Sequence, residues 1–377
     1  MEVFLLGLLV GSFMIQIGFY LLIFSRLAFW QKNNTIKKES DFPISVIICA
    51  RNEANNLKEN LPAVFAQKYV NFEVVLVNDR STDETAAVLA HFAENNSHAK
   101  VVHIPDNVTT DHHKGKKFAL SKGIQAAKYD YILLTDADCK PASPHWISAI
   151  STHFTSPDFY QVVLGYSPYE FQNTFLNRCI QYETMQTALH YLSFALAKMP
   201  YMGVGRNLAY HKTLFFDEGG FDKHQHIASG DDDLFVNAVA NGKNTTISIE
   251  KEAICYSKPA ETWEAWYHQK TRHYSTASHY QQKHQLFLGA IALSHFVFYV
   301  MLGAVLILYS SPSIAIALAV IRLLVQLLIY TKIKKILLVP LRLVEIILFD
   351  VLYVLYYVVF APALFVNKTV KWRNQVL

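Results

Sequence analysis

Apolar and polar stretches alternate regularly along the chain between Pro43 and Thr135. Each short apolar run has the length of a strand, and each is followed by a longer stretch with helix-like spacing of its apolar residues. This order is typical of a parallel sheet whose strands are joined by right-handed crossovers, so we expect an α/β domain. The pattern predicts strands at Ile44–Ala50, Phe72–Asn78, Val101–Ile104 and Tyr131–Thr135, with helices at Asn55–Gln67, Asp83–Ala93 and Lys117–Lys128.

Polar side chains follow several of the predicted strands at their carboxyl ends. Arg51, Asn52 and Glu53 follow the first strand, Asp79 follows the second and Asp136 follows the last. Because ligands of parallel sheets bind at the carboxyl ends of the strands, we expect a site at this edge. The loop after the first strand reads ARNEANN and has no glycine-rich pattern, which argues against a dinucleotide-binding domain and against a nucleotidyltransferase.

Two acidic residues, Asp136 and Asp138, follow the apolar run Tyr131–Thr135 with only Ala137 between them. In an extended chain, residues two apart point the same way, so both carboxylates can face one point. Such carboxylates repel each other unless a proton or a cation lies between them. We expect a divalent cation, Mg²⁺ or Mn²⁺, because these ions prefer oxygen ligands. An acidic turn after a strand is the alternative that this stretch alone leaves open.

Three long apolar stretches predict membrane-spanning helices. Val3–Phe24 has no charged residue, no basic segment before it and no clear cleavage site after it, so it predicts a retained anchor. Leu286–Tyr309 and Ser313–Tyr330 predict two further spans, joined by a short turn that contains Ser-Ser-Pro. Hydrophobic residues make up 52% of the chain and charged residues 17%, which is apolar for a wholly soluble protein.

A fourth apolar stretch, Ile336–Val366, has two interpretations. It is either one long span kinked at Pro340 or a shorter span preceded by an interfacial helix. Its charged residues Arg342, Glu345 and Asp350 are not expected to face lipid, and we expect them to pair with one another or with other helices.

The charges around the first span predict its orientation. Arg26, Lys32, Lys37 and Lys38 follow that span, which predicts a cytoplasmic position for the next domain and a multi-pass protein of the inner cell membrane. The formal net charge is only +4, and no basic block alternates with aromatic residues. A nucleic-acid partner is therefore not expected.

A run of three acidic residues, Asp231, Asp232 and Asp233, precedes a helix-like pattern that begins at Leu234. One or two of them could cap the helix, because the helix dipole favours acidic residues at the N-terminus. Three exceed what a cap requires, so at least one carboxylate is available as a general base.

The stretch Thr262–His284 is rich in Trp, Tyr, His and Gln. Trp263, Trp266, Tyr267 and Lys270 are spaced so that they share one face of a helix. Because apolar sequence follows at once, we expect this helix to lie in the membrane interface. A helix packed in the protein core is the alternative.

The order of these segments resembles that of family 2 glycosyltransferases with the GT-A fold. Among them, the membrane-anchored bacterial enzymes of polysaccharide and glycolipid synthesis are the most similar. The resemblance extends from Pro43 to about Tyr280 and rests on the joint order of the motifs rather than on any one of them. The matching segments are SVIICARNEANNL, VVLVNDRSTDET, HKGKKFALSKG, DAD, GRNLAYHKTLFFDEGGF, SGDDDL and QKTRH. Ser121 stands where the family usually has Asn, and His273 stands where it has Trp.

The resemblance implies roles for individual residues. Asp79 would contact the nucleobase, and Asp138 together with Asp136 would hold the metal ion. Asp232, beside Asp231, would be the general base that deprotonates the acceptor hydroxyl. The other residues that it assigns to substrate binding are Arg51, Glu53, Lys116, Asp136, Arg206, Asn207, Gln269, Arg272 and His273, with Lys116 near the donor and Arg272 against the diphosphate.

The expected function is an inverting, metal-dependent transfer of a sugar from a nucleoside diphosphate sugar, with uridine as the favoured base. The acceptor would be lipid-linked or a saccharide at the cytoplasmic membrane face. The expected organisation is an anchor at 1–30, a GT-A domain at 42–261, an interfacial helix at 262–284 and a transmembrane region of two to three spans at 285–377.

Two alternative functions remain open. The first is a processive polysaccharide synthase that extrudes its polymer, which His273 and the small number of spans disfavour. The second is a membrane-tethered, non-catalytic protein that binds nucleotide-sugar. The intact Asp138, Asp232 and Arg272 argue against it, since a binding module needs no general base.

Overall fold

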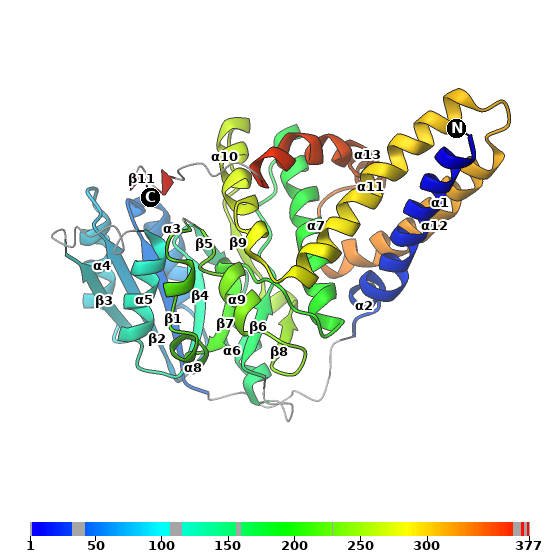
Figure 1. Cartoon of the computed structure of the whole chain (residues 1–377). Coiled ribbons are helices and arrows are strands. Elements are labelled where there is room, and N and C mark those ends of the chain that lie inside the picture. Colours follow the sequence, from blue (N-terminus) through cyan, green and yellow to red (C-terminus); the bar gives the residue numbers. More distant parts are fainter. Residues whose placement is uncertain are drawn as a thin grey trace. The chain divides into compact units, whose positions relative to one another are not determined.

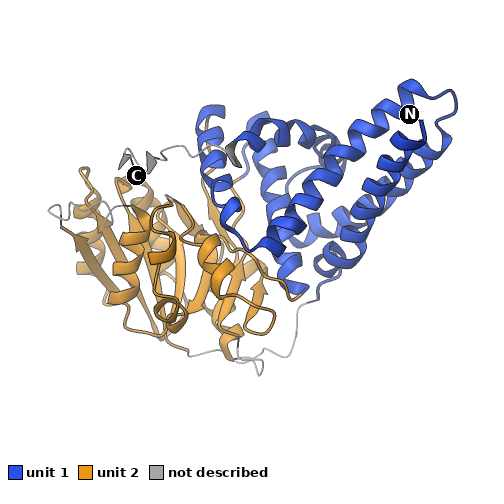
Figure 2. Cartoon of the chain, in the orientation of Figure 1, with its two compact units in different colours: residues 1–31, 171–197, 262–366 blue, residues 32–170, 198–261, 367–377 orange. Residues whose placement is uncertain are grey.

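The computed structural model describes residues 2–31, 42–105, 115–155, 160–227, 229–364, 371–372 and 375–376. The chain folds into two compact units (Figure 2). Unit 1 comprises Met1–Gln31, Phe171–Ala197 and Thr262–Val366, and unit 2 comprises Lys32–Glu170, Lys198–Glu261 and Asn367–Leu377. This division differs from the expected one, because residues 171–197 belong with the apolar helices rather than with the α/β domain expected at 42–261.

Among its described residues, unit 2 contains a seven-stranded sheet in the order β3-β2-β1-β4-β7-β6-β8 (Figure 1). Its first half is parallel and consists of β1 (Ile44–Ala50), β2 (Phe72–Asp79), β3 (Ala99–Ile104) and β4 (Tyr131–Asp136). The connecting helices are α3 (Ala54–Phe65), α4 (Thr85–Asn95) and α5 (Lys116–Ala126). The predicted α/β fold with a mostly parallel sheet is therefore confirmed.

The second half of the sheet is formed by the less regular part of unit 2. β7 (Leu208–His211) pairs antiparallel with β4 and with β6 (Val162–Gly165), and β6 pairs parallel with β8 (Thr245–Ser248). β5 (Cys139–Pro141) and β9 (Cys255–Ser257) form a separate antiparallel pair. The helices of this half are α6 (Trp146–Ser151), α8 (Thr213–Asp217) and α9 (Asp233–Val239).

A glycine in α5 brings this helix close to the sheet. A Cβ atom at Gly123 would lie 2.6 Å from Cγ2 of Ile47 in β1 and 3.0 Å from Cγ2 of Val77 in β2. Any larger residue would push the helix away from these buried strands. The close packing of α5 fixes its first residue, Lys116, at the carboxyl edge of the sheet.

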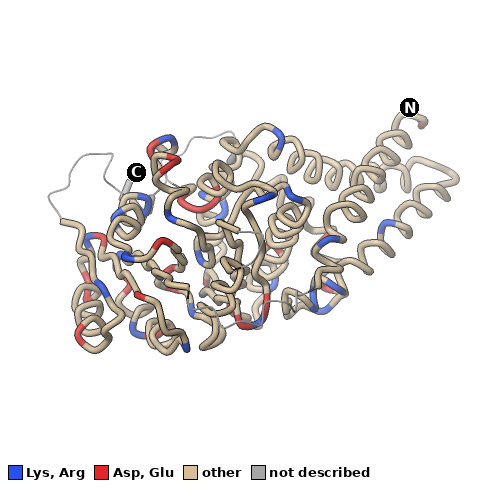
Figure 3. The backbone as a smooth tube through the Cα atoms, turned by 90° about the horizontal axis from the view of Figure 1, so that it is seen from below, with Lys and Arg blue, Asp and Glu red and all other residues tan. Residues whose placement is uncertain are grey.

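Unit 1 is built from long helices. α1 (Glu2–Phe19), a π-helical turn (Tyr20–Phe24) and α2 (Ser25–Ala28) form one continuous helix. Within the described residues, this helix and three others are long and apolar enough to cross a membrane: α11 (Gln282–Leu308), α12 (Ser313–Ile336) and α13 (Leu343–Phe360). Charged residues are sparse along these helices (Figure 3). Lys32, Lys37 and Lys38, expected to orient the first span, lie outside the described residues.

The apolar stretch that begins at Ile336 is divided between two helices. α12 ends at Ile336 and α13 begins at Leu343, with Pro340 in the segment between them. The interpretation as one long kinked helix is therefore wrong, because proline and the turn around it end the first helix. Within 337–342 the structure has no interfacial helix either.

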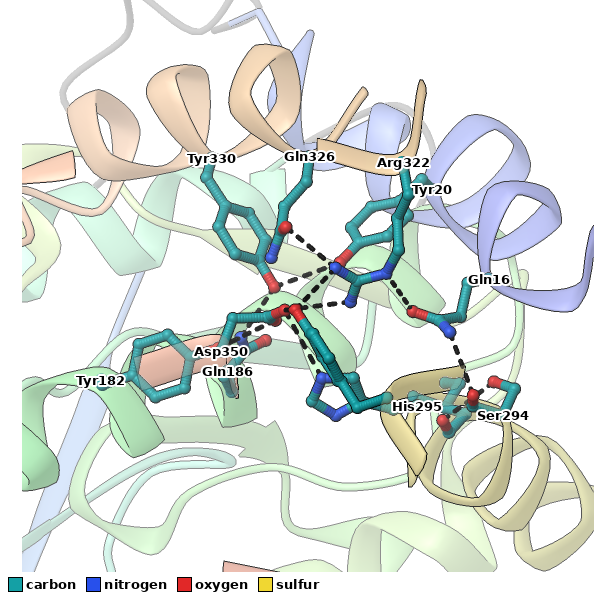
Figure 4. A network of polar contacts seen from close by, with 12 residues as sticks. Gln16, Tyr20, Tyr182, Gln186, Ser294, His295, Arg322, Gln326, Tyr330 and Asp350 are labelled. Carbon is teal, nitrogen blue, oxygen red and sulfur yellow. Dashed lines mark hydrogen bonds and ion pairs between the residues drawn. The ribbon is translucent and has the colours of Figure 1, made fainter. Parts of the chain in front are cut away.

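A buried ion pair joins α12 to α13 (Figure 4). Arg322 donates to Asp350 at 3.0 Å, and both side chains are almost fully buried. The guanidinium also donates to Gln16, Tyr299 and Gln326, and the carboxylate accepts from Tyr182 and Tyr299. This network satisfies a charge pair that would otherwise be costly in an apolar surrounding.

Glu345 forms the second ion-pair group of unit 1. It pairs with Arg342 at the start of α13 and with Arg178 of α7 (Phe175–Leu196). The expectation that Arg342, Glu345 and Asp350 pair with one another or with other helices is confirmed.

α10 (Trp263–Tyr274) is the helix expected at the membrane interface. The rings of Trp266 and Tyr267 lie 5.7 and 5.5 Å from the ring of Phe360 in α13. Lys270 is buried and forms an ion pair with Glu183 of α7. This face of α10 therefore packs inside unit 1, and the prediction that it lies against the bilayer is wrong for Trp266 and Lys270.

Candidate active site

The carboxyl ends of the central strands bring the candidate residues of unit 2 together. In the β1–β2 pair Ala50 lies opposite Asn78, and in the β1–β4 pair Cys49 lies opposite Asp136. The polar residues that follow β1 and β2 and those that end β4 therefore share one edge of the sheet. The expectation of polar groups gathered at this edge is confirmed.

Asp79, the last residue of β2, is fully buried between two guanidinium groups. Its carboxylate lies 2.6 Å from Arg80 and 3.7 Å from Arg51. Burial raises the pKa of Asp79, and the two arginines oppose that shift. Sequence reasoning missed Arg80, although it follows Asp79 directly. Arg80 has a positive φ of 51°, so the chain turns sharply at the point where its side chain folds back onto Asp79.

Glu53 is largely enclosed in the loop that follows β1. Its carboxylate accepts a hydrogen bond from Asn56 at 2.6 Å, and its backbone N–H donates to Thr85 at 2.8 Å. These bonds tie the start of α3 to the start of α4. The structure thus gives Glu53 a role in holding the loop at this edge.

Asp136 and Asp138 lie at the end of β4 with Cys139 beside them. One potential ligand atom from each of the three side chains lies within 4.8 Å of the others. Mg²⁺ binds oxygen ligands at about 2.0–2.1 Å and prefers carboxylates, so two carboxylates that lie this near each other are a suitable pair of ligands. Burial and the neighbouring Asp136 raise the pKa of Asp138, while Arg206 opposes the shift. The arrangement fits a hard divalent cation held by the two carboxylates.

Lys116 connects this acidic pair to the acidic run before α9. Its Nζ atom lies 2.8 Å from Oδ1 of Asp136 and 2.9 Å from Oδ2 of Asp231. Burial alone would lower the pKa of Lys116, but the two carboxylates raise it well above its ordinary value. The residue before it, Gly115, has a φ of 84°, which positions the first turn of α5.

The three acidic residues at 231–233 have different environments. Asp232 is the N-cap of α9: its Oδ1 accepts from the N–H of Asp233 at 2.7 Å and its Oδ2 accepts from the N–H of Gly205 at 2.6 Å. Burial and the two neighbouring acids raise the pKa of Asp232 to about 7. Although Asp231 is buried, Lys116 lowers its pKa. The expectation that some of these acids cap the helix is confirmed for Asp232.

Arg206 and Asn207 are adjacent but serve different purposes. The Arg206 guanidinium lies 4.3 Å from the ring centroid of Tyr169. Asn207 is fully buried, and its amide accepts from Nε1 of Trp146 at 3.0 Å and donates to the carbonyls of Tyr166 and Ala253 at 2.8 Å each. Its hydrogen-bonding groups are occupied inside the protein, so the prediction that Asn207 binds substrate is corrected to a structural role.

Gln269, Arg272 and His273 lie on α10 and belong to unit 1. Within unit 2 the predicted residues that gather at the sheet edge are Arg51, Glu53, Asp79, Lys116, Asp136, Asp138, Arg206, Asp231 and Asp232. The chemistry that they offer is the binding of a cation and of a polar ligand next to a carboxylate that can accept a proton near neutral pH.

Comparison with known proteins gives the family of this domain. Residues 45–217 match the family model described as glycosyl transferase family 2. A probable glycosyltransferase of Bacillus subtilis, YdaM, is 27% identical over 276 residues, which cover 70% of this chain and 62% of the relative. Poly-β-1,6-N-acetyl-D-glucosamine synthase of Staphylococcus aureus is 35% identical over 95 residues, which cover 25% of this chain and 21% of the synthase. The chain thus spans less than two thirds of the length of either curated relative.

A solved structure supports the fold assignment. The mannosyltransferase PcManGT from Pyrobaculum calidifontis, in complex with GDP-Man and Mn²⁺, superposes with a TM-score of 0.58 at 19% sequence identity. The match covers 94% of this chain and 99% of that protein. Together with the parallel sheet and the site at its carboxyl edge, these similarities identify residues 45–217 as a family 2 glycosyltransferase domain with the GT-A fold.

Proposed function

We propose that this protein transfers a sugar from a nucleoside diphosphate sugar to a lipid-linked or saccharide acceptor, with inversion at the anomeric carbon. The observation that carries the proposal is the meeting of Asp136 and Asp138 with Asp231 and Asp232 at one edge of the sheet, linked through Lys116. A cation-binding pair beside a proton acceptor is what such a transfer requires, because charge develops on the leaving diphosphate while the acceptor loses a proton.

The donor would lie along the carboxyl ends of β1, β2 and β4. Asp79, held between Arg80 and Arg51, is suited to accept hydrogen bonds from a nucleobase. Uridine is the base that we favour. The structurally similar mannosyltransferase was solved with GDP-Man, so guanosine donors belong in any test.

A divalent cation, Mg²⁺ or Mn²⁺, would be held by Asp138 together with Asp136, where it would neutralise negative charge on the departing diphosphate. Arg206 faces the same acidic group and would add a fixed positive charge. Arg272 of α10 is proposed to contact the diphosphate as well, with Gln269 and His273 beside it on that helix.

Asp232 is the general base in this proposal. A carboxylate with a pKa of about 7 can hold a proton taken from an acceptor hydroxyl at neutral pH. Asp231 is less suited, because its ion pair with Lys116 favours the ionised form. The two backbone N–H groups that donate to Asp232 would fix its orientation and leave further lone pairs for the acceptor.

The proposal that the reaction takes place at a membrane is supported by the helices of unit 1, which are long and apolar enough to cross a bilayer. We propose that the catalytic domain faces the cytoplasm of a bacterial inner membrane and that a lipid-linked acceptor is presented there. The similarity to a poly-β-1,6-N-acetyl-D-glucosamine synthase favours processive synthesis as a second candidate, although it covers only 25% of this chain.

The test is nucleoside diphosphate release by the full-length protein in detergent, with a panel of UDP and GDP sugars, with Mn²⁺, Mg²⁺ or EDTA, and with or without membrane lipid extract. We expect release that requires metal and disappears in Asp138→Asn and Asp232→Asn. Asp130→Asn is the matched control, because Asp130 precedes the opposite end of β4 and forms an exposed ion pair with Lys212. Equal turnover of all four proteins would remove both proposed roles, and intact donor binding without release would favour the non-catalytic alternative.

A further inference from the structure

Lys116 is a cation placed inside the acidic group at the carboxyl edge of the sheet. Its ammonium lies within 3 Å of carboxylate oxygens from two different segments, Asp136 at 2.8 Å and Asp231 at 2.9 Å. Both carboxylates are thereby neutralised in the structure. Asp136 is also one of the two carboxylates that fit a divalent cation.

One carboxylate cannot serve two cations equally well, because an ammonium and a divalent ion a few ångströms apart repel each other. We propose that Lys116 competes with the metal ion for Asp136: its ammonium pairs with this carboxylate and thereby weakens the binding of free metal. The inference rests on the metal-binding part of the proposed function and adds a control on when that site is filled.

The chain arranges this competition through the first turn of α5. Gly115 and the close packing at Gly123 fix the helix start, so that the side chain of Lys116 points to the acidic group. The next residue, Lys117, is directed elsewhere: its Nζ donates to the carbonyl oxygens of His224 at 2.6 Å and of Ile227 at 3.0 Å. The two adjacent lysines thus have different roles: Lys117 holds the loop that contains His224 and Ile227, and Lys116 pairs with the carboxylates of Asp136 and Asp231.

A purely structural role for Lys116 makes a different prediction. If the ammonium only tied β4 to the segment before α9, its removal would loosen both carboxylates and leave metal binding equal or weaker. If it competes with the metal, its removal strengthens metal binding. The direction of the change therefore separates the two roles.

The experiment measures Mn²⁺ binding by the full-length protein in detergent, without any nucleotide, from the electron paramagnetic resonance signal of free Mn²⁺. We expect Lys116→Met to bind Mn²⁺ at least about tenfold more tightly than the unchanged protein, since a unit charge is removed within a few ångströms of a divalent ion. Lys116→Arg keeps the charge and should bind as weakly as the unchanged protein. Lys122→Met, on the exposed side of α5, removes the same charge away from the site and should have no effect.

Asp138→Asn distinguishes failure of the inference from failure of the metal site. If Asp138→Asn abolishes binding while Lys116→Met binds no more tightly than the unchanged protein, the competition is refuted and the metal site stands. If Asp138→Asn binds Mn²⁺ as well as the unchanged protein, the proposed metal site is itself wrong, and the inference fails with it. Thermal unfolding of each variant shows whether it is folded. If Lys116→Met is not folded, Lys116→Gln, which also removes the charge but keeps a polar side chain, takes its place with the same expected tightening of Mn²⁺ binding.

Discussion

The backbone N–H of Gly205 donates a hydrogen bond of 2.6 Å to Oδ2 of Asp232, so the proposed general base is held by a glycine from a distant segment. A Cβ atom at position 205 would lie 3.2 Å from that oxygen and 3.3 Å from the Cβ of Asp232. Glycine suits position 205 because its N–H orients the Asp232 carboxylate, and any side chain at this position would crowd that carboxylate.

Gly205→Ala should therefore displace Asp232 and slow the chemical step. We expect kcat to fall by about tenfold or more, because small displacements of a catalytic group are costly, while the KM for the donor changes little. Gly303→Ala in α11 is the control, since a Cβ there meets no atom within 4 Å. An unchanged kcat in Gly205→Ala would mean that the position of Asp232 does not limit the reaction.

The rate of transfer should depend on pH through Asp232. Its pKa is raised to about 7 in the folded protein, and a general base must be ionised to act. The value of kcat/KM should rise about tenfold for each pH unit below 7 and level off above it. The measurement is a pH profile from pH 5 to 9 at saturating metal. A profile that is flat above about pH 5 would instead assign the role to Asp231, whose pKa is lowered.

Asn207→Ala should lower stability rather than donor affinity. The change leaves Nε1 of Trp146 and the carbonyls of Tyr166 and Ala253 without their partner in a buried site. We expect the free energy of unfolding to fall by about 2–4 kcal/mol. Asn96→Ala, which removes one bond to the carbonyl of Phe92, should cost about 1 kcal/mol or less. A large loss of donor affinity in folded Asn207→Ala would restore its predicted role in binding.

The ion pair of Arg322 with Asp350 should be strongly coupled in unfolding experiments. Asp350→Leu leaves the buried guanidinium without its anion, and we expect a loss of about 3–5 kcal/mol. The double variant Arg322→Met with Asp350→Leu should recover much of this loss, because neither charge is then left unpaired. Thermal unfolding in detergent provides the comparison. Arg322→Met alone completes the comparison. If the losses of stability in the two single variants simply add in the double variant, the two residues act independently.

The sequence was sufficient for the parallel half of the sheet, because each strand from β1 to β4 is a continuous apolar run with a periodic helix after it. It was not sufficient for β6, β7 and β8, which have four residues each and lie in a region without a regular alternation. Motif order indicated Asp136, Asp138 and Asp232, but the contact of Lys116 with Asp231 joins residues more than a hundred positions apart and follows only from the folded chain.

The sequence also could not predict which surface covers the apolar face of a helix. The aromatic face of α10 has the composition of an interface helix, yet Trp266 packs on Phe360 and Lys270 pairs with Glu183. Periodicity shows that a helix has an apolar face, whereas the surface that covers this face depends on residues elsewhere in the chain. α7 was assigned to the α/β domain for the same reason, since its position in the chain says nothing of its neighbours in space.

The interleaving of the two units has a consequence for how the protein can be divided. The chain leaves unit 2 after Glu170, forms α7 within unit 1 and returns to unit 2 at Lys198, so no single cut at either end separates the two units. A fragment of residues 42–261 would carry α7 without the helices that cover it, with buried side chains such as Tyr182, Met185 and Leu189 laid open to solvent. Such a fragment should aggregate, whereas one in which a short polar linker replaces residues 171–197 has the better prospect of a soluble catalytic domain.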